Sequence, residues 1–231
     1  MKKLAIIPAR GGSKRIPRKN IKLFLGKPII AYSIKAAVES NLFDEVMVST
    51  DDNEIAEIAK QYGAKVPFFR SKINSSDVAT TIDVITEVIE KYKEKSLIFQ
   101  YTCCIYPCAP FVTKQTLLKS FEILQNNDFD CVFPVAKYGH PIQRALQLNK
   151  DCKIQMIQPE NMQVRTQDLK PSYHDLGQFY FVKTEGVINN KQLWNDNTGF
   201  IELKEIESHD IDTIEDWEMA EFKYKYLNNR K

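Results

Sequence analysis

The chain has 231 residues, of which 43% are hydrophobic and 27% are charged, and its formal net charge is +2. These values suit one soluble globular domain of generous size and exclude intrinsically disordered and fibrous proteins. No run of roughly 18 apolar residues is present, so we expect neither a membrane span nor a membrane partner.

The first residues begin like a secretion signal but lack its length. Met1-Lys2-Lys3 precedes an apolar run that Pro8 ends after four residues, whereas a signal segment needs roughly 7–15. We interpret residues 4–8 as a first β-strand and expect a cytoplasmic protein. The five cysteines form no Cys-x-x-Cys pair, which argues against a zinc site and favours free thiols in a reducing compartment.

Strands and helices alternate through the first 135 residues. Further strands are expected at 46–49, 65–69, 96–101 and 131–135, and helices at 29–38, 53–62, 80–92 and 113–124. Asp52 offers a helix N-cap, Gly63 a helix end, and Thr80 with Asp83 a capping box. This alternation predicts an α/β fold with a mostly parallel Rossmann-like sheet and helices on both faces.

The alternation stops after Val135. Residues 136–176 contain three prolines and no convincing helix, and a loop of this length without structure of its own would be unusual. We predict that a single domain of residues 1–231 carries 136–176 as an extended, projecting β-arm for dimerisation, so that the protein forms a homodimer. A strand at 177–182 and a closing helix at 213–226 follow.

Charge is concentrated at the two ends of the chain. Residues 1–38 hold ten Lys or Arg and no acid, whereas residues 202–221 hold nine acids and one Lys. A basic beginning and an acidic end suit a site that binds a polyanion on one side and a metal ion on the other. The basic residues lie among Gly and Pro without an aromatic platform for base stacking, so we expect no nucleic-acid partner.

The strongest local signal is the loop after the first strand. From residue 7 it reads Ile-Pro-Ala-Arg-Gly-Gly-Ser-Lys-Arg-Ile-Pro-Arg-Lys-Asn, and six cations lie between Arg10 and Lys22. The loop leaves the carboxyl end of a strand, where α/β sheets bind ligands, and its glycines let backbone N–H groups approach phosphate oxygens. It matches neither a Walker A loop nor a dinucleotide fingerprint. We expect it to bind a triphosphate; the alternative is a solvated basic loop.

This loop resembles the N-terminal signature of the CMP-sugar synthetases, Pro-Ala-Arg-x-Gly-Ser-Lys-x-x-x-x-Lys-Asn. Further matches cover nearly the whole chain: Gly26-Lys27-Pro28, Val48-Ser49-Thr50-Asp51, 76–81, 106–110, His140-Pro141 and Asp210-Ile211-Asp212. The resemblance implies a sheet of the nucleotide-diphospho-sugar transferase type. It also implies an enzyme that couples CTP to a nine-carbon sugar acid, giving a CMP-sugar and pyrophosphate.

Two stretches look most like the pseudaminic acid branch of that family, residues 13–22 and residues 173–180. The sialic acid branch usually has Arg-Pro-Asn-Gly where this chain has His174-Asp175-Leu176-Gly177. This departure falls in a stretch that the resemblance assigns to sugar binding, and it favours pseudaminic acid over N-acetylneuraminic acid. CMP-legionaminic and CMP-N-acetylneuraminic acid synthesis remain the alternatives.

The resemblance also assigns the nucleotide site. Arg10 and Lys19 would hold the phosphates and act in catalysis, with backbone help from Ala9, Gly12 and Ser13. Four residues would line the cytidine pocket: Asn20, Arg70, Ser76 and Thr80. The guanidinium of Arg70 can donate to the carbonyl of cytosine, and its alternative role is a surface salt bridge.

Asp210 and Asp212 form the candidate metal site, with Asp212 counted as catalytic. Acids spaced i, i+2 on an extended segment point to the same side, with Ile211 turned inward. Two such carboxylates can bind Mg²⁺ together with phosphate oxygens, and the alternative is a solvated acidic pair. Asp216 instead fits a capping box with Thr213 at the start of the last helix.

Six residues are candidates for sugar binding: Tyr106, Gln143, Arg144, Arg165, His174 and Gln178. Arginine is the natural bidentate partner for the carboxylate of a sugar acid. Arg144 and Arg165 lie in the predicted arm, so they complete the site of a neighbouring subunit or are ordinary surface residues. His140 and His209 lack metal-ligand spacing, and we interpret them as structural.

Three other classes of protein are alternatives to a CTP-dependent sugar-coupling enzyme. A metal-dependent glycosyltransferase would share the sheet and the acidic pair but would not need so dense a triphosphate loop. A non-catalytic nucleotide-binding regulator would keep the loop but not the acids. A nucleic-acid binder would use the basic segment without CTP, and its binding would be sensitive to salt.

Overall fold

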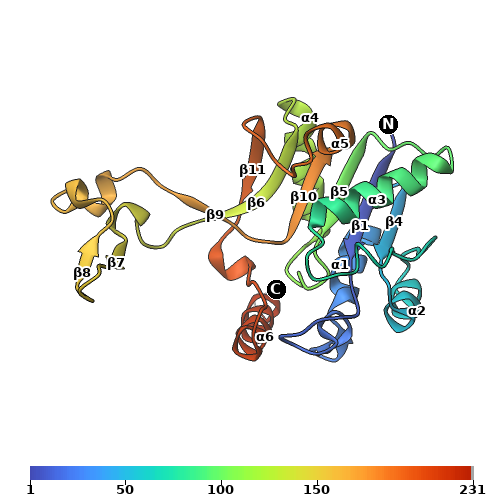
Figure 1. Cartoon of the computed structure of the whole chain (residues 1–231), viewed down its shortest axis with the longest axis horizontal. Coiled ribbons are helices and arrows are strands. Elements are labelled where there is room, and N and C mark those ends of the chain that lie inside the picture. Colours follow the sequence, from blue (N-terminus) through green and yellow to red (C-terminus); the bar gives the residue numbers. More distant parts are fainter. Residues whose placement is uncertain (230–231) are drawn as a thin grey trace.

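A seven-stranded sheet forms the centre of the molecule, which the computed structural model describes for residues 1–229 (Figure 1). Its main path runs β11-β6-β10-β5-β1-β4, and β9 pairs with β6. The bounds are β1 Lys3–Pro8, β4 Glu45–Ser49, β5 Tyr101–Ile105, β6 Cys131–Lys137, β9 Tyr173–Asp175, β10 Phe179–Lys183 and β11 Thr198–Glu202. A small hairpin joins β2 Leu23–Phe24 to β3 Lys27–Pro28.

Five of the seven strands in the sheet, β4, β1, β5, β6 and β11, run in the same direction. β1 is parallel to both β4 and β5, and β6 is parallel to β11. β10 lies antiparallel between β5 and β6, and β9 is antiparallel to β6. The expected mostly parallel sheet is therefore confirmed, with β9 and β10 as its reversed strands.

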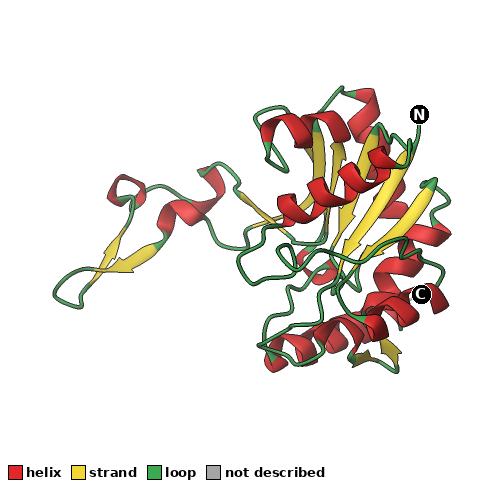
Figure 2. Cartoon of the chain, turned by 45° about the vertical axis from the view of Figure 1, so that its right-hand side comes forward, coloured by secondary structure: helices red, strands yellow, loops and turns green. Residues whose placement is uncertain are grey.

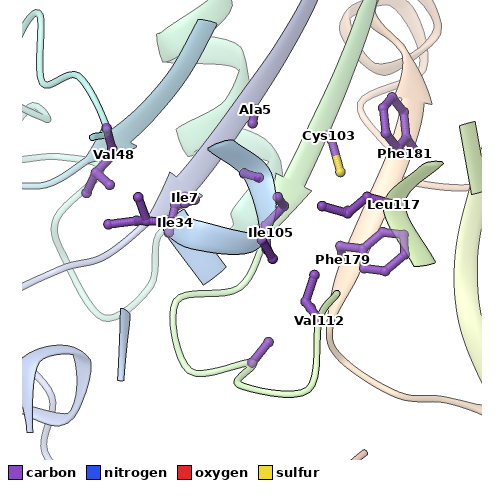
Figure 3. Close-up of a cluster of buried hydrophobic side chains, with 14 of the residues drawn as sticks. Ala5, Ile7, Ile34, Val48, Cys103, Ile105, Val112, Leu117, Phe179 and Phe181 are labelled. Atoms are coloured by element: carbon purple, nitrogen blue, oxygen red, sulfur yellow. The ribbon is translucent and has the colours of Figure 1, made fainter. Parts of the chain in front are cut away.

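Helices cover both faces of the sheet (Figure 2). They are α1 Ile30–Glu39, α2 Asn53–Gln61, α3 Thr81–Glu94, α4 Lys114–Asn126, α5 Thr184–Asn190 and α6 Ile214–Asn228. Side chains alternate along β1, so that Ala5 and Ile7 pack with α1, α2 and α4, whereas Leu4 and Ile6 pack with α3 and α5. Figure 3 shows the first of these two clusters, with Ile34 of α1 and Leu117 of α4 against the strands.

The last helix, α6, packs on a third cluster below the sheet. Trp217 and Ala220 bury against Phe24, Ile29 and the loop residue Ile16. Thr213 and Asp216 form the predicted capping box at its start, as Thr80 and Asp83 do for α3. Ile16 of the loop that follows β1 and Ile211, which precedes α6, belong to the same buried cluster, so the beginning of α6 lies beside that loop.

Several boundaries differ from the sequence-based expectation. The expected strand at 65–69 is reduced to one bridge between Met47 and Lys65. The strand expected at 96–101 lies instead at Tyr101–Ile105, because the buried run includes Cys103 and Cys104 and Ser96 adopts a left-handed φ of 60°. The strands β9 and β11 and the short helix α5 were not predicted, since none has a long periodic pattern.

Residues 138–172 project from the sheet as an arm, drawn in yellow to light orange in Figure 1 and visible from a second side in Figure 2. The arm contains the antiparallel pair β7 Leu146–Leu148 and β8 Ile154–Met156. Three short 3-10 helices complete it, Ile142–Arg144, Pro159–Asn161 and Thr166–Asp168. Among residues 1–229, no helix combines the length and the apolar character needed to cross a membrane.

Candidate active site

The basic loop leaves the carboxyl end of β1 and is anchored on its outer side by α2. Ala9 N donates to Ser49 O of β4 at 2.9 Å, which extends the sheet pairing by one residue. Arg18, at a left-handed φ of 54°, donates to both carboxylate oxygens of Asp52 and also reaches Glu54. Chiefly because of Arg18, the pKa of Asp52 is lowered to about 2. This charge-assisted contact fixes the outer end of the loop.

Gly11 and Gly12 occupy the loop for different reasons. Gly11 N donates to Asp51 Oδ1 at 2.9 Å. A Cβ on Gly11 would lie 2.7 Å from Asp52 Oδ2, so any side chain at position 11 would push the loop away from Asp51 and Asp52. A Cβ on Gly12 would meet nothing within 4 Å, and its backbone is not left-handed. Packing within the chain therefore does not require glycine at position 12, whereas close approach of a phosphate to the backbone would.

Arg10 reaches from the loop to the segment that precedes α3. Its Nη1 donates to Ser76 O at 3.1 Å and lies 2.8 Å from Asp77 Oδ1, and Lys14 pairs with the other oxygen of that carboxylate. The hydrogen bond from Lys14 is the largest cause that lowers the pKa of Asp77. Two loop cations thus share one half-exposed carboxylate.

Lys19 and Arg15 join the loop to the acidic end of the chain. Lys19 Nζ donates to Ile211 O at 2.6 Å and lies 3.7 Å from Asp212 Oδ1, and Arg15 Nη1 lies 2.7 Å from Asp212 Oδ2. Ile211 is buried, as its position between two acids predicted. Segments 192 residues apart in the sequence therefore meet, and Figure 1 shows the dark-blue loop beside the red α6.

One hollow opens along the loop, and a second lies on the other side of the contact between Arg10 and Ser76. One, of about 210 Å³, is lined by Pro8, Arg10, Ser13, Lys14, Arg15, Ile16, Lys19, Asn20 and Pro107. The other, of about 530 Å³, is lined by Asp51, Asn53, Phe69, Arg70, Lys72, Ser75 and Ser76. The hydrogen bond from Arg10 to Ser76 joins the two linings. The first hollow offers several cations, and the second offers hydroxyl, amide and guanidinium groups.

Arg70 is buried, with only 8% of its surface exposed, so it forms no surface salt bridge. Its Nε donates to Ser49 Oγ at 3.1 Å and its Nη2 donates to Ser49 O, while Nη1 has no hydrogen-bond partner among residues 1–229. Burial is the main reason why its pKa is lowered. The guanidinium is therefore oriented by β4, with one nitrogen uncommitted at the edge of the larger hollow.

Ser76, Thr80 and Asn20 take part in contacts that hold the site together. Ser76 Oγ donates to Ile73 O at 2.7 Å, and Thr80 caps α3 through Asp83. Asn20, 5% exposed, donates through Nδ2 to Arg10 O at 2.9 Å. For Thr80 and Asn20, the side-chain polar groups are used within the chain.

Of the two acids, Asp212 lies beside Lys19. Asp210 is exposed, Asp212 is partly buried, and the backbone N–H of Asp212 donates to Asp216 Oδ2 at 3.0 Å. Within residues 1–229, no group of three or more His, Cys, Asp or Glu side chains is arranged to hold a metal ion. The two carboxylates nonetheless offer hard oxygen ligands of the kind that Mg²⁺ accepts.

Tyr106 and Gln178 lie in the body of the protein, at the carboxyl end of β5. Tyr106 N donates to Gln178 O at 2.9 Å, and burial raises the pKa of the Tyr106 hydroxyl. Gln178 is 3% exposed; its Nε2 donates to Glu207 O at 2.9 Å, and its Oε1 is buried without a partner among the described residues. A buried amide oxygen without a partner is costly unless a ligand or water donates to it.

The other sugar candidates lie on the arm or at its base. His174, in β9, packs against Tyr138 with ring centroids 4.9 Å apart and the ring planes tilted by 53°. Gln143 Nε2 donates to Lys170 O at 2.9 Å within the arm. Arg144 is partly buried, and Arg165 is exposed. The arm carries Gln143, Arg144 and Arg165 away from the basic loop of the same chain (Figures 1 and 2).

The family model described as Cytidylyltransferase matches residues 4–227. The chain belongs to the cytidylyltransferase family. Pseudaminic acid cytidylyltransferase from Campylobacter jejuni is 43% identical over 225 residues, covering 97% of each chain. CMP-N,N'-diacetyllegionaminic acid synthase from Legionella pneumophila is 34% identical over 230 residues, covering 96% of this chain and 95% of that one.

Solved structures agree with this assignment at the level of the fold. CMP:2-keto-3-deoxy-manno-octonic acid synthetase complexed with CTP has a TM-score of 0.73 at 17% identity, covering 98% of this cytidylyltransferase and all of that chain. Together with the family match, these relatives confirm the expected CTP-dependent nucleotidyltransferase and its fold type.

Sequence reasoning gave no role to four residues in or next to the candidate site: Lys14, Arg15, Asp77 and Cys108. The first two were counted among the loop cations but given no role, although their spacing from Lys19 places them on the same loop. Asp77 was visible only as part of a family motif. Cys108, whose Sγ donates to Asn20 Oδ1 at 3.2 Å, was grouped with buried thiols, and no sequence signal marked it.

Proposed function

We propose that this cytidylyltransferase couples CTP to pseudaminic acid, with attack of the sugar's anomeric hydroxyl on the α-phosphorus and release of pyrophosphate. The observation that carries the proposal is the hollow at the carboxyl end of β1, which is lined by four cations of the loop, Arg10, Lys14, Arg15 and Lys19. Support for the sugar comes from the full-length relative at 43% identity and from residues 173–180.

Arg10 and Lys19 would bind the phosphates and stabilise the charge that develops on departing pyrophosphate, and backbone N–H groups of Ala9, Gly12 and Ser13 would assist. Such phosphoryl-type chemistry depends mostly on positioning and on neutralising charge. Because Arg10 and Lys14 already share Asp77, the triphosphate would replace that carboxylate as their partner. The loop therefore needs little rearrangement of its own cations to receive the nucleotide.

The cytidine would occupy the larger hollow. Arg70 offers an uncommitted Nη1, and its other nitrogens are held by Ser49, so it can donate to the base carbonyl at little entropic cost. Ser76 lines the same hollow. Asn20 and Thr80 would shape the pocket through Arg10 and α3 respectively, since their own polar groups are engaged.

Asp210 and Asp212 would hold Mg²⁺ with phosphate oxygens and water as the remaining ligands. The bound ion would supply additional neutralisation of phosphate charge. Arg15, which pairs with Asp212, would then be released to face the phosphates. Asp212 is for this reason the acid that we propose as catalytic.

For the sugar, Tyr106 and Gln178 would act from the same chain, while Gln143, Arg144 and Arg165 would act from the arm of a second subunit, together with His174 from β9 at the base of that arm. The exposed side chains of Leu146, Leu148 and Ile154, each more than half exposed, support a homodimer that covers this arm. All five cysteines are free thiols, which supports a location in a reducing compartment such as the cytoplasm.

A pyrophosphate-release assay with CTP, Mg²⁺ and separate nine-carbon sugar acids tests the proposal. We expect turnover with pseudaminic acid and at least tenfold lower kcat/KM with legionaminic or N-acetylneuraminic acid. Preferential turnover of either alternative would replace the proposed sugar. Absence of CTP-dependent pyrophosphate release with all three would overturn the proposed reaction.

A further inference from the structure

The side chain of Asn20 joins the basic loop to the segment that follows β5. Its Nδ2 donates to Arg10 O at 2.9 Å, and its Oδ1 accepts a hydrogen bond from Cys108 Sγ at 3.2 Å. Asn20 is 5% exposed, so neither contact is readily replaced by bulk water. The amide therefore closes the loop between residues 10 and 20 and attaches it to a different part of the fold.

The Asn20 amide needs a hydrogen-bond donor at position 108. The carbonyl of Arg10 can only accept, so the NH₂ end of the amide must face it. The oxygen end then faces Cys108 and needs a donor there. Burial raises the pKa of the Cys108 thiol to about 12, so the sulfur carries its proton and can donate.

Cys108 is itself attached to a rigid part of the protein. Two residues earlier, Tyr106 N donates to Gln178 O at 2.9 Å, and Tyr106 O accepts from Ser33 Oγ of α1 at 2.8 Å. The outer end of the loop is fixed separately, through Arg18 and Asp52. The contact with Cys108 is thus a second, inner anchor, directly next to Lys19 in the sequence.

We propose that Cys108 is a positioning residue for nucleotide binding. Its S–H group holds the oxygen end of the Asn20 amide in place, and Asn20 holds the backbone at Arg10, so that Arg10 and Lys19 face the triphosphate in a preset geometry. This inference rests on the proposed binding of the CTP triphosphate by the loop. A preset loop improves affinity because less conformational freedom is lost when the ligand binds.

The test compares Cys108→Ala, which removes the donor, with Cys108→Ser, which keeps one. Cys152→Ala, in the exposed turn of the arm, is the matched control. CTP binding is measured by calorimetry with Mg²⁺, and KM and kcat by pyrophosphate release. We expect Cys108→Ala to raise both Kd and KM for CTP roughly fivefold to tenfold. The kcat of Cys108→Ala should stay within about twofold of the wild-type value. For Cys108→Ser and Cys152→Ala, the Kd, KM and kcat should all stay within about twofold of the wild-type values.

A double-mutant cycle shows whether the effect passes through Asn20. If it does, Cys108→Ala should cause no further loss of CTP affinity in an Asn20→Ala background. The inference would be overturned if the losses of CTP affinity caused by Cys108→Ala and Asn20→Ala multiplied in the double variant. It would also be overturned if Cys108→Ser bound CTP as weakly as Cys108→Ala. Where thermal unfolding shows that Cys108→Ala does not fold, Cys108→Val, which also lacks a donor, replaces it.

Failure of this inference is distinguishable from failure of the proposed function. If the wild-type protein binds no CTP, the proposed function fails. If the wild type binds CTP and Arg10→Ala does not, while Cys108→Ala binds as the wild type does, only the role of Cys108 is overturned.

Discussion

The basic loop and the arm carry the two halves of the proposed site, and the chain holds them in opposite ways. The loop is tied to the body at both ends, by Ala9 N to Ser49 O where it begins, and by Arg18 to Asp52 and Lys19 to Ile211 O near its end. The arm's hydrogen bonds, such as Gln143 to Lys170 O, largely join arm residues to one another. The basic loop is therefore held by contacts with the body of its own chain, whereas the arm extends away from that body (Figure 1).

This difference has a physical basis in the two sequences. Cations and acids far apart in the chain attract one another, so the loop is drawn to Asp77 and Asp212 without a partner molecule. The arm instead exposes Leu146, Leu148 and Ile154, which no part of the body covers. Apolar side chains gain most from a second protein surface, and this favours completion of the sugar half by another subunit.

The largest expected effect concerns the acid that the loop meets. Asp212→Asn should lower kcat about a thousandfold, because a carboxylate proposed to bind metal and to pair with Arg15 is lost. The measurement is pyrophosphate release at saturating CTP and Mg²⁺. Glu218→Gln, an exposed acid on α6, is the matched control and should retain full activity. Wild-type turnover by Asp212→Asn, with thermal unfolding unchanged, would contradict the metal assignment.

Mixing two inactive variants tests whether the arm serves a neighbouring subunit. Arg10→Ala and Arg165→Ala should each be strongly impaired as purified homodimers. If the arm crosses to the partner, each mixed dimer contains one intact site, so an equal mixture should regain about a quarter of wild-type activity. Subunits are exchanged under mild denaturant before the assay. No regain in a mixture that sedimentation shows to contain mixed dimers would mean that each arm serves its own chain.

A smaller effect is expected at Asp77, which competes with phosphate for the loop cations. Asp77→Asn should lower KM for CTP roughly twofold to fivefold at low salt, and the gain should shrink as salt screens the charges. Asp128→Asn, which removes an exposed partner of Lys183 far along the sheet, is the control. A raised KM in Asp77→Asn would show that the carboxylate contributes to nucleotide binding instead of opposing it.

The outer anchor of the loop predicts a pH-dependent stability. The pKa of Asp52 is lowered to about 2, chiefly by Arg18, from an ordinary value of 3.8. The ion pair between Arg18 and Asp52 therefore stabilises the folded protein fully above about pH 4, and this stabilisation is lost as the pH falls through about 2. Arg18→Ala should lower the free energy of unfolding by about 1 kcal/mol at pH 7, after allowance for solvent exposure, and by less at pH 3. Urea unfolding of the wild type and of Arg18→Ala at the two pH values measures the loss of stability. If that loss is equal at both pH values, the ion pair is not its cause.

Much of the fold could be predicted from local patterns. The capping residues Asp52, Thr80 and Thr213 all cap helices as expected, because a cap depends on residues only three positions apart. The prediction of a strand at 65–69 was wrong because a strand depends on partners far away in the sequence. Its apolar residues suit a strand, but only Lys65 finds a partner on β4, and sheet pairing depends on tertiary contacts that no local pattern reveals.

The sequence by itself determined that a basic, glycine-containing loop follows the first strand and that an acidic pair with a buried Ile211 lies near the other end of the chain. Charge, glycine placement and alternation are local properties, so they are readable without a fold. Only the tertiary structure decided that these two segments meet, that Lys14 and Arg10 share Asp77, and that Cys108 completes the contacts of Asn20. Those contacts depend on which strands become neighbours in the sheet, and strand order is a property of the whole chain.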